Sequence, residues 1–166
     1  VALPPTDIEL IFDCTYTAPA PSVTCLNTLL RSASNTPVPD IVALAATPTG
    51  DGIVNLASSG AFSVATVNVR SSGTITASAD TGEATLPVSI TLCETNPATG
   101  ACINPPAPTS GPVATSIASG ATPTFACFVT STGTVPFDPA NNRIFVRFKD
   151  ALGVTRGSTS VAVRTQ

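Results

Sequence analysis

The stretch TLPVSITL, residues 85–92, decides the fold class of this chain. Its aliphatic residues Leu86, Val88, Ile90 and Leu92 alternate with threonine, proline and serine. A period of two is typical of a strand with one packed face and one face in water. Because the proline within it cannot donate a backbone hydrogen bond, we expect this strand at a sheet edge or with a bulge.

The same alternation recurs along the chain. In NRIFVRFK, residues 142–149, Ile144 and Val146 are expected to point inward while the basic residues point outward. In FSVATVNV, residues 62–69, the phase of the pattern changes, which predicts a bulge near Ala65. Further strands are expected over residues 7–13, 40–46, 52–56, 61–70, 73–79, 112–118, 125–129 and 158–165.

Turn-forming sequences separate these strands. ETNPATGAC, residues 94–102, begins with an Asn-Pro pair that suits a type I turn, and Gly100 suits the left-handed residue that closes the loop. KDALGV, residues 149–154, predicts the tight link of a C-terminal hairpin. INPPAPTSGP, residues 103–112, predicts a proline-rich loop and not a strand. Only CLNTLLRSA, residues 25–33, has weak helical spacing, enough for one turn.

Many short strands with little or no helix predict an all-β chain, an antiparallel β-sandwich of Ig-like or jelly-roll-like type. We expect one sandwich over residues 36–166, with residues 1–35 as a strand-bearing arm or first layer. The alternative is two small Ig-like sandwiches divided near residue 82. Against it, no stretch in the middle has the composition of a linker, and the two halves show no convincing self-similarity.

Composition excludes several classes of function. Only 10% of the residues are charged, and the chain has no His, no Trp and no Met. Without histidine, neither Ser–His nor Cys–His catalysis is available. The formal net charge of −3 argues against a nucleic-acid partner. No apolar run approaches the ~18 residues of a membrane-spanning helix, so we expect no membrane insertion.

Five cysteines bear on the compartment. The simplest pairing is local, Cys14 with Cys25 and Cys93 with Cys102, and it implies an oxidising compartment. By loop entropy, a bond closing the second loop would contribute about 2.5 kcal/mol. Cys127 lies in the apolar stretch FACFV and is expected to be a buried, unpaired residue; the alternative is a bond to another chain.

The triplet Asp80-Thr81-Gly82 matches the catalytic triplet of aspartic proteases. Such an enzyme needs two carboxylates that share a proton, and this chain has a single triplet. The small residues before Asp80 and the charge of Glu83 after the triplet also depart from that pattern. We therefore interpret the triplet as a surface turn, at which Asp80→Asn should cost little stability, and keep the protease as a remote alternative.

Two binding functions stand as alternatives. Sugar binding by stacking is disfavoured because the one aromatic residue with a polar tip is Tyr16, although binding by hydrogen bonds alone is compatible with the sequence. Calcium is the other candidate, although no EF-hand spacing exists. Its possible ligands in loops are Asp51, Asn55, Asp138, Asn141 and Asn142.

LPVSITLCETNPATGACINPPAP, residues 86–108, followed by PFDPANNRIFVRFKDALGVTRGSTSVAVRT, residues 136–165, resembles modules of large secreted bacterial surface proteins. Those modules are Ig-like or pre-peptidase-like β-sandwiches, often repeated along one chain. The resemblance covers roughly residues 37–166. It implies a part of an adhesin, a stalk or a surface layer, and it carries over no catalytic residue.

We therefore expect a secreted, cell-surface structural protein that is not an enzyme and needs no cofactor. It would be a filament subunit or an adhesin module, with copies of itself or a neighbouring module as partner. The assembly contact would be the N-terminal strand, whose apolar face is Ile8, Leu10 and Phe12. Its receiver would be the edge of the basic C-terminal hairpin, which carries Arg143, Arg147 and Lys149. The competing expectation is that this strand pairs within its own sandwich.

Overall fold

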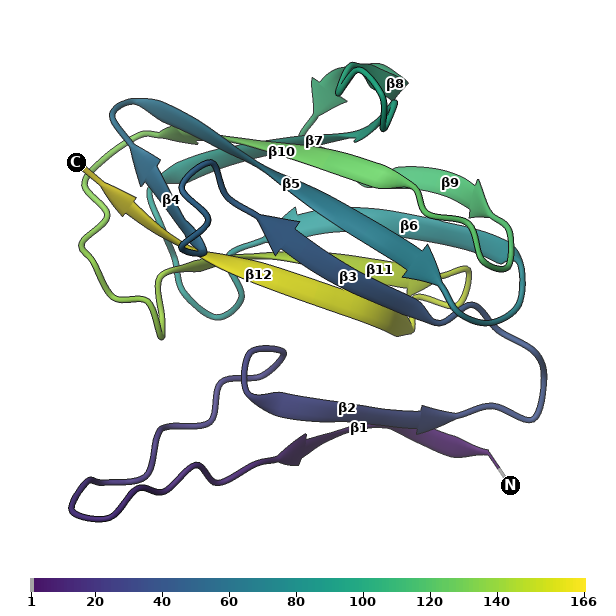
Figure 1. Ribbon diagram of the computed structural model, residues 1–166, viewed down its shortest axis with the longest axis horizontal. Coiled ribbons are helices and arrows are strands. Elements are labelled where there is room, and N and C mark those ends of the chain that lie inside the picture. Colours follow the sequence, from purple (N-terminus) through teal and green to yellow (C-terminus); the bar gives the residue numbers. More distant parts are fainter. Residues whose placement is uncertain (1) are drawn as a thin grey trace. The chain divides into compact units, whose positions relative to one another are not determined.

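The structure is a computed structural model that describes residues 2–166, and within them the chain forms strands and no helix. It divides into two compact units, Val1–Pro37 and Val38–Gln166. The larger unit is a sandwich of two five-stranded sheets, and the smaller, the hairpin unit, is a two-stranded sheet (Figure 1). The expected all-β sandwich is therefore confirmed. Among the described residues, no helix is long and apolar enough to cross a bilayer.

The first sheet has the strand order β3-β5-β10-β7-β8, and every neighbouring pair is antiparallel. Its strands are β3 (Ile41–Ala46), β5 (Ser59–Asn68), β10 (Thr124–Ser131), β7 (Val88–Thr95) and β8 (Cys102–Thr109). The bulge predicted near Ala65 is wrong, because β5 pairs with both neighbours without a register shift. The inward face of β5 continues through buried Thr66 and Asn68, whose side chains are hydrogen-bonded.

The second sheet has the strand order β4-β12-β11-β6-β9. Its strands are β4 (Ile53–Leu56), β12 (Thr155–Thr165), β11 (Arg143–Asp150), β6 (Gly73–Asp80) and β9 (Val113–Ile117). The β4–β12 pair is parallel and the others are antiparallel. In both sheets, strands from the two sides of residue 82 pair with one another, β5 with β10 and β6 with β11. A division near residue 82 would therefore separate paired strands.

The inward faces of the two sheets pack into one hydrophobic core. Phe125 of β10 and Phe148 of β11 meet across it with ring centroids 5.3 Å apart. Leu56, Ile75 and Val146 are almost fully buried beside them. Burying a side chain of this size contributes about 1.5–3 kcal/mol, so the core carries most of the folding free energy of the sandwich.

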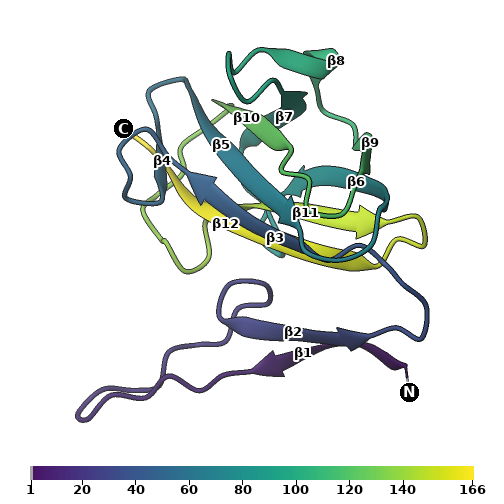
Figure 2. The same ribbon diagram turned by 45° about the vertical axis from the view of Figure 1, so that its right-hand side comes forward.

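One side of the sandwich is closed by contact between the sheets. β3 and the first half of β12 lie side by side in two views (Figure 1 and Figure 2). The backbone N–H of Ala45 donates to Oγ1 of Thr159 at 3.2 Å. Gly157 lies directly against the backbone carbonyl of Ile41, and a Cβ atom there would overlap that carbonyl. β12 thereby covers the edge of β3 that has no partner in its own sheet.

The predicted turns are present. Gly100 has φ of 72° and its N–H donates to the carbonyl of Asn96 at 2.8 Å, as the sequence ETNPATGAC predicts. Gly153 has φ of 77° in the link between β11 and β12. Left-handed backbone favours glycine at both positions. These turns connect β7 to β8 and β11 to β12, which pair with each other as neighbouring strands.

Two predicted segment types are wrong. Residues 103–112 are predicted as a loop, but most of them belong to β8, which pairs with β7 through shifted registers. Because β8 lies at a sheet edge, prolines without an N–H are tolerated there. The helical turn expected within residues 25–33 is replaced by β2 (Thr28–Ala33), which pairs antiparallel with β1 (Leu3–Glu9). Pairing along the whole strand outweighs a weak local preference for helix.

Candidate functional site

Positive charge gathers on the outer face of β11 and β12. Since β11 alternates, Ile144, Val146 and Phe148 point into the core and its basic residues point outward, as the sequence predicts. β12 adds Arg164 on the same outer face, whereas Arg156 is nearly buried against Asp150, which has the inward parity of Phe148. The four cations of the outer face, hereafter the basic face, are Arg143, Arg147, Lys149 and Arg164.

Arg147 forms the central ion pair of the basic face. Its Nε lies 2.7 Å from Oδ2 of Asp80, and a second guanidinium nitrogen lies 3.2 Å from Oδ1. The guanidinium also lies over the ring of Phe145, 4.8 Å from its centroid. Phe145 points outward but is only 3% exposed, so the pair holds an aromatic ring against the sheet.

The triplet Asp80-Thr81-Gly82 is a turn, as predicted. The N–H of Gly82 donates to Oδ1 of Asp80 at 2.8 Å, and φ of Gly82 is 64°. Both carboxylate oxygens are thus occupied by donors, which is unlike a protease carboxylate that shares a proton with a second one. The expectation that Asp80→Asn costs little is corrected, because this carboxylate balances the partly buried charge of Arg147.

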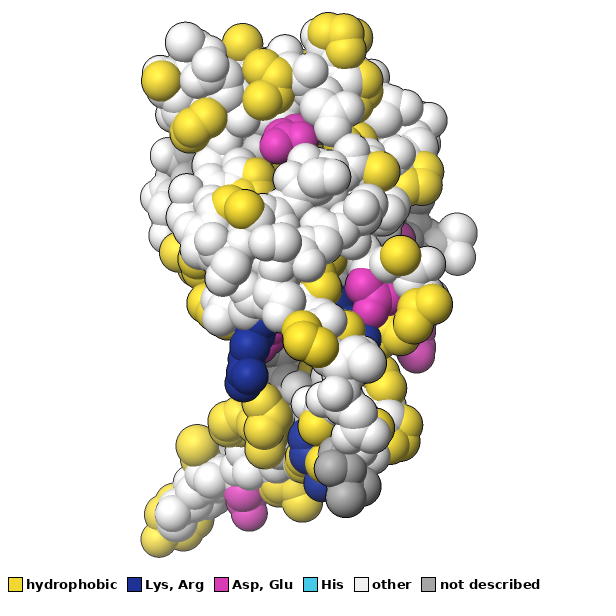
Figure 3. All heavy atoms as spheres, turned by 90° about the vertical axis from the view of Figure 1, so that its right-hand side faces the viewer, with side chains coloured by type: hydrophobic (Ala, Val, Ile, Leu, Met, Phe, Trp, Pro, Cys, Tyr) yellow, Lys and Arg dark blue, Asp and Glu magenta, His cyan; other side chains and the backbone are white. Residues whose placement is uncertain are grey.

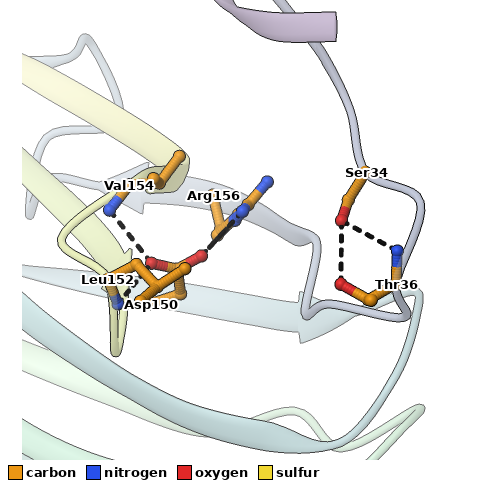
Figure 4. Close-up of polar contacts among 6 residues, drawn as sticks. All are labelled: Ser34, Thr36, Asp150, Leu152, Val154 and Arg156. Atoms are coloured by element: carbon orange, nitrogen blue, oxygen red, sulfur yellow. Dashed lines mark hydrogen bonds and ion pairs between the residues drawn. The ribbon is translucent and has the colours of Figure 1, made fainter. Parts of the chain in front are cut away.

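A second ion pair lies at the end of β11. Asp150 accepts hydrogen bonds from the N–H groups of Leu152 and Val154 and from Nε of Arg156, which lies 2.7 Å away (Figure 4). Burial alone would raise the pKa of Asp150, but the Arg156 hydrogen bond and the two N–H groups outweigh it and hold the pKa below its ordinary value of 3.8. The pair therefore fixes the turn between β11 and β12.

The remaining cations are mostly engaged within the chain. Arg143 donates to Oγ of Ser160 at 3.0 Å, and burial lowers the pKa of its guanidinium. Arg164 donates to Oδ1 of Asn55 at 2.6 Å. Lys149 alone has no such partner among residues 2–166. Most side chains of the basic face therefore stabilise contacts with residues of other strands.

The structure changes the geometry of the predicted assembly contact. β11 lies between β12 and β6, so the edge of the C-terminal hairpin at β11 is already paired and cannot receive a strand. Ile8 lies in β1, but Leu10 and Phe12 follow the end of that strand. β1 pairs with β2 and with neither sheet of the sandwich. A role of Ile8, Leu10 and Phe12 in assembly stays a prediction, but the edge of β11 that it required is not available.

The cysteines are arranged partly as predicted. Cys93 and Cys102 form a disulfide that joins β7 to β8, which confirms that pairing. Cys127 is fully buried in the core without a disulfide, and burial raises the pKa of its thiol to about 12. The predicted bond between Cys14 and Cys25 is not formed. The backbone of each is held in a separate turn of the loop between β1 and β2.

The candidate calcium ligands do not converge. Asp51 accepts hydrogen bonds from two threonine hydroxyls, and Asn55 accepts one from a guanidinium. Asp138 pairs with Asn141, and Asn142 donates to a nearby carbonyl. Across the described residues, no group of three or more His, Cys, Asp or Glu side chains is placed to hold a metal ion. Asn55 lies in β4, and the other four belong to turns and loops, as the simpler interpretation holds for them.

The hairpin unit has an exposed apolar surface, in which the sequence analysis included Leu10 and Phe12 but missed Leu29. Within the described part of this unit every residue is half-buried or exposed, so it has no hydrophobic core of its own. Hydrophobic side chains are visible at its surface in the lower part of Figure 3. Its exposed large apolar residues are Leu3, Leu10, Ile11, Phe12, Tyr16 and Leu29. The missed signal was the strand pattern of residues 28–33, which a helical interpretation concealed.

Comparison with known proteins gives few relatives. No family model matches the chain, and no curated protein matches it. The resemblance to surface-protein modules therefore stays a prediction. The solved structure of AvmM, which catalyses macrocyclization in alchivemycin A biosynthesis, matches with a TM-score of 0.43 and 14% identity. The match covers 76% of this chain and 88% of that one.

The expectation of a non-enzymatic structural protein is corrected: the fold does not support it, and the protein in the matched solved structure catalyses a reaction. The filament and adhesin assignments are withdrawn with it, since a sandwich architecture does not separate structural proteins from enzymes. A TM-score of 0.43 and 14% identity assign no reaction to this chain.

Proposed function

We propose that this chain is a protein-binding subunit that engages another polypeptide through its hairpin unit. The observation that carries the proposal is the exposure of six large apolar side chains on a unit whose described residues are all half-buried or exposed. An isolated two-stranded hairpin is at best marginally stable in water, so such a unit needs a surface to pack against. Exposed apolar patches of this kind typically mark interaction sites.

The energetics suit a binding role. Ile11 is 78% exposed, Leu29 is 55% exposed and Phe12 is 51% exposed. Covering the exposed part of each such side chain would contribute about 1 kcal/mol or more. Rigid-body and ordering costs of association reduce the sum, which leaves an affinity set by how well the partner surface fits.

Site-specific photo-crosslinking in the cells that make the protein tests this function. A photoreactive residue replaces Leu29 or Phe12 in the full-length chain, and a control places it at Leu44, which is 71% exposed on the sandwich. We expect discrete adducts from the two hairpin positions and none from the control position. Absence of hairpin adducts, or equal adducts from all three positions, would refute the proposal.

A further inference from the structure

The two strands of the hairpin unit have unlike outer edges. β1 contains Pro4 and Pro5, which have no N–H to donate, so its outer edge is blunted. β2 has the sequence TLLRSA and no proline. Within residues 2–166, no hydrogen bond reaches residues 29–33 from any segment other than β1. The outer edge of β2 therefore presents unpaired backbone N–H and C=O groups, which is the usual template for strand addition.

Unlike β2, the edge strands of the sandwich are protected from pairing with another chain. β3 is covered along its edge by β12, and β8 carries three prolines. The other edge strands, β4 and β9, have four and five residues, whereas β2 has six. Edges that are short, covered or rich in proline resist pairing with another chain. The β2 edge is the one long edge of the described chain that lacks these protections.

We propose that two copies of this chain associate through their β2 edges, which pair antiparallel about a twofold axis. This inference rests on the proposed function and names the partner as a second copy. The result is a four-stranded sheet in the order β1-β2-β2-β1, which passes the size at which a sheet with an apolar face becomes stable. The contact is isologous, so it closes as a dimer and does not propagate into a fibre.

The sequence of β2 selects one register. With Leu30 at the twofold axis, Leu30 faces its own copy, Leu29 faces Arg31 of the other copy, and Thr28 faces Ser32. The two Leu30 side chains then meet at the centre, small polar residues meet at the ends, and no like charges lie opposite each other. A register centred on Arg31 would place two like charges directly opposite, which is unfavourable. Ile8 pairs with Leu29 across the hairpin, on the face of the sheet opposite to that of Leu30.

Sedimentation of the full-length chain over a wide range of concentration tests the inference. We expect a monomer–dimer equilibrium that Leu30→Lys weakens by at least about tenfold, because two like charges then lie opposite each other. The matched control is Leu44→Lys on the sandwich, which should dimerise like the parent chain. A parent chain that stays monomeric, or a dimer that resists Leu30→Lys, would overturn the inference.

Disulfide trapping covers the case in which Leu30→Lys simply disrupts the hairpin. In a Cys14→Ser, Cys25→Ser background, Leu30→Cys should form a covalent dimer on oxidation, since directly opposite Cβ atoms lie about 4.5–5.5 Å apart. Thr6→Cys, on β1, should crosslink far more slowly. Equal rates at the two positions would contradict the β2 edge as the contact.

The experiments distinguish a failure of the dimer inference from a failure of the proposed binding function. A monomeric chain whose hairpin still photo-crosslinks to one other protein, but not to itself, would refute the second-copy inference and leave the binding function in place. A chain that neither dimerises nor crosslinks at the hairpin would refute both.

Discussion

The ion pair between Asp80 and Arg147 makes a quantitative prediction about the sandwich. In Asp80→Asn, the amide oxygen can still accept the Gly82 N–H, so the turn keeps its cap. The charge opposite Arg147 is lost, and that side chain is only 18% exposed. A hydrogen bond to a charged group is worth about 1.5–3 kcal/mol. Because the Asp80 side chain is 41% exposed, solvent screening reduces the expected loss to about 1–2 kcal/mol.

The matched control is Asp40→Asn. Asp40 also faces an arginine, Arg70, but at 4.0 Å and with side chains 55% and 74% exposed. An exposed pair of this kind contributes about 0–0.5 kcal/mol. The two substitutions make the same chemical change, so the difference between them isolates the effect of burial and of the two-point contact.

Equilibrium urea unfolding followed by far-UV circular dichroism gives both free energies. Fluorescence is less useful, because the chain has no Trp and its one Tyr, Tyr16, lies in the hairpin unit. The comparison requires that the unfolding free energy falls with urea concentration at the same slope in each variant. If Asp80→Asn and Asp40→Asn destabilise equally, the two-point ion pair does not support the sandwich and the reasoning fails.

Three further predictions concern the sandwich. Gly157→Ala places a methyl group against the backbone of β3 and should cost about 3 kcal/mol or more, whereas Gly111→Ala, whose methyl group would make only an ordinary contact with Thr109, should stay within about 0.5 kcal/mol; urea midpoints compare them. Replacing Cys93 and Cys102 by alanine should cost about 2.5 kcal/mol, and a melting temperature insensitive to reductant would contradict this. The lowered pKa of Asp150 contributes stability that is complete above its ordinary value of 3.8 and is lost as pH falls through the folded-state pKa; acid titration of Asp150→Asn should lack that part of the loss.

The sandwich strands are predictable because they alternate. In β11 the inward residues Ile144, Val146 and Phe148 are large and apolar, and the pattern places its basic residues outward correctly. In β5 the same rule misplaces a bulge, because Thr66 and Asn68 point inward as hydrogen-bonded polar residues. β8 is missed because its prolines resemble a loop, and only its position at a sheet edge makes them acceptable.

The candidate site is less predictable than the fold. The sequence places the cations of the basic face on one surface, but not the carboxylates that neutralise Arg147 and Arg156 from residues 80 and 150. The strand that pairs with residues 3–9 lies about twenty residues later in the sequence. The loop between the two strands has no local pattern that predicts this pairing. Leu29 and Leu30 suit a helix or a strand equally well, so local propensity does not locate the open β2 edge.

The strand order of the second sheet has a consequence for the kinetics of folding. β11 and β12, formed by residues 143–165, separate β4 on one side from β6 and β9 on the other. During synthesis from the N-terminus, β4 therefore emerges long before its partner β12, and β6 long before its partner β11. Non-local pairing of this kind makes folding slow and leaves unpaired apolar strands open to misassociation. The sandwich should consequently complete its second layer only after residue 165 has been added.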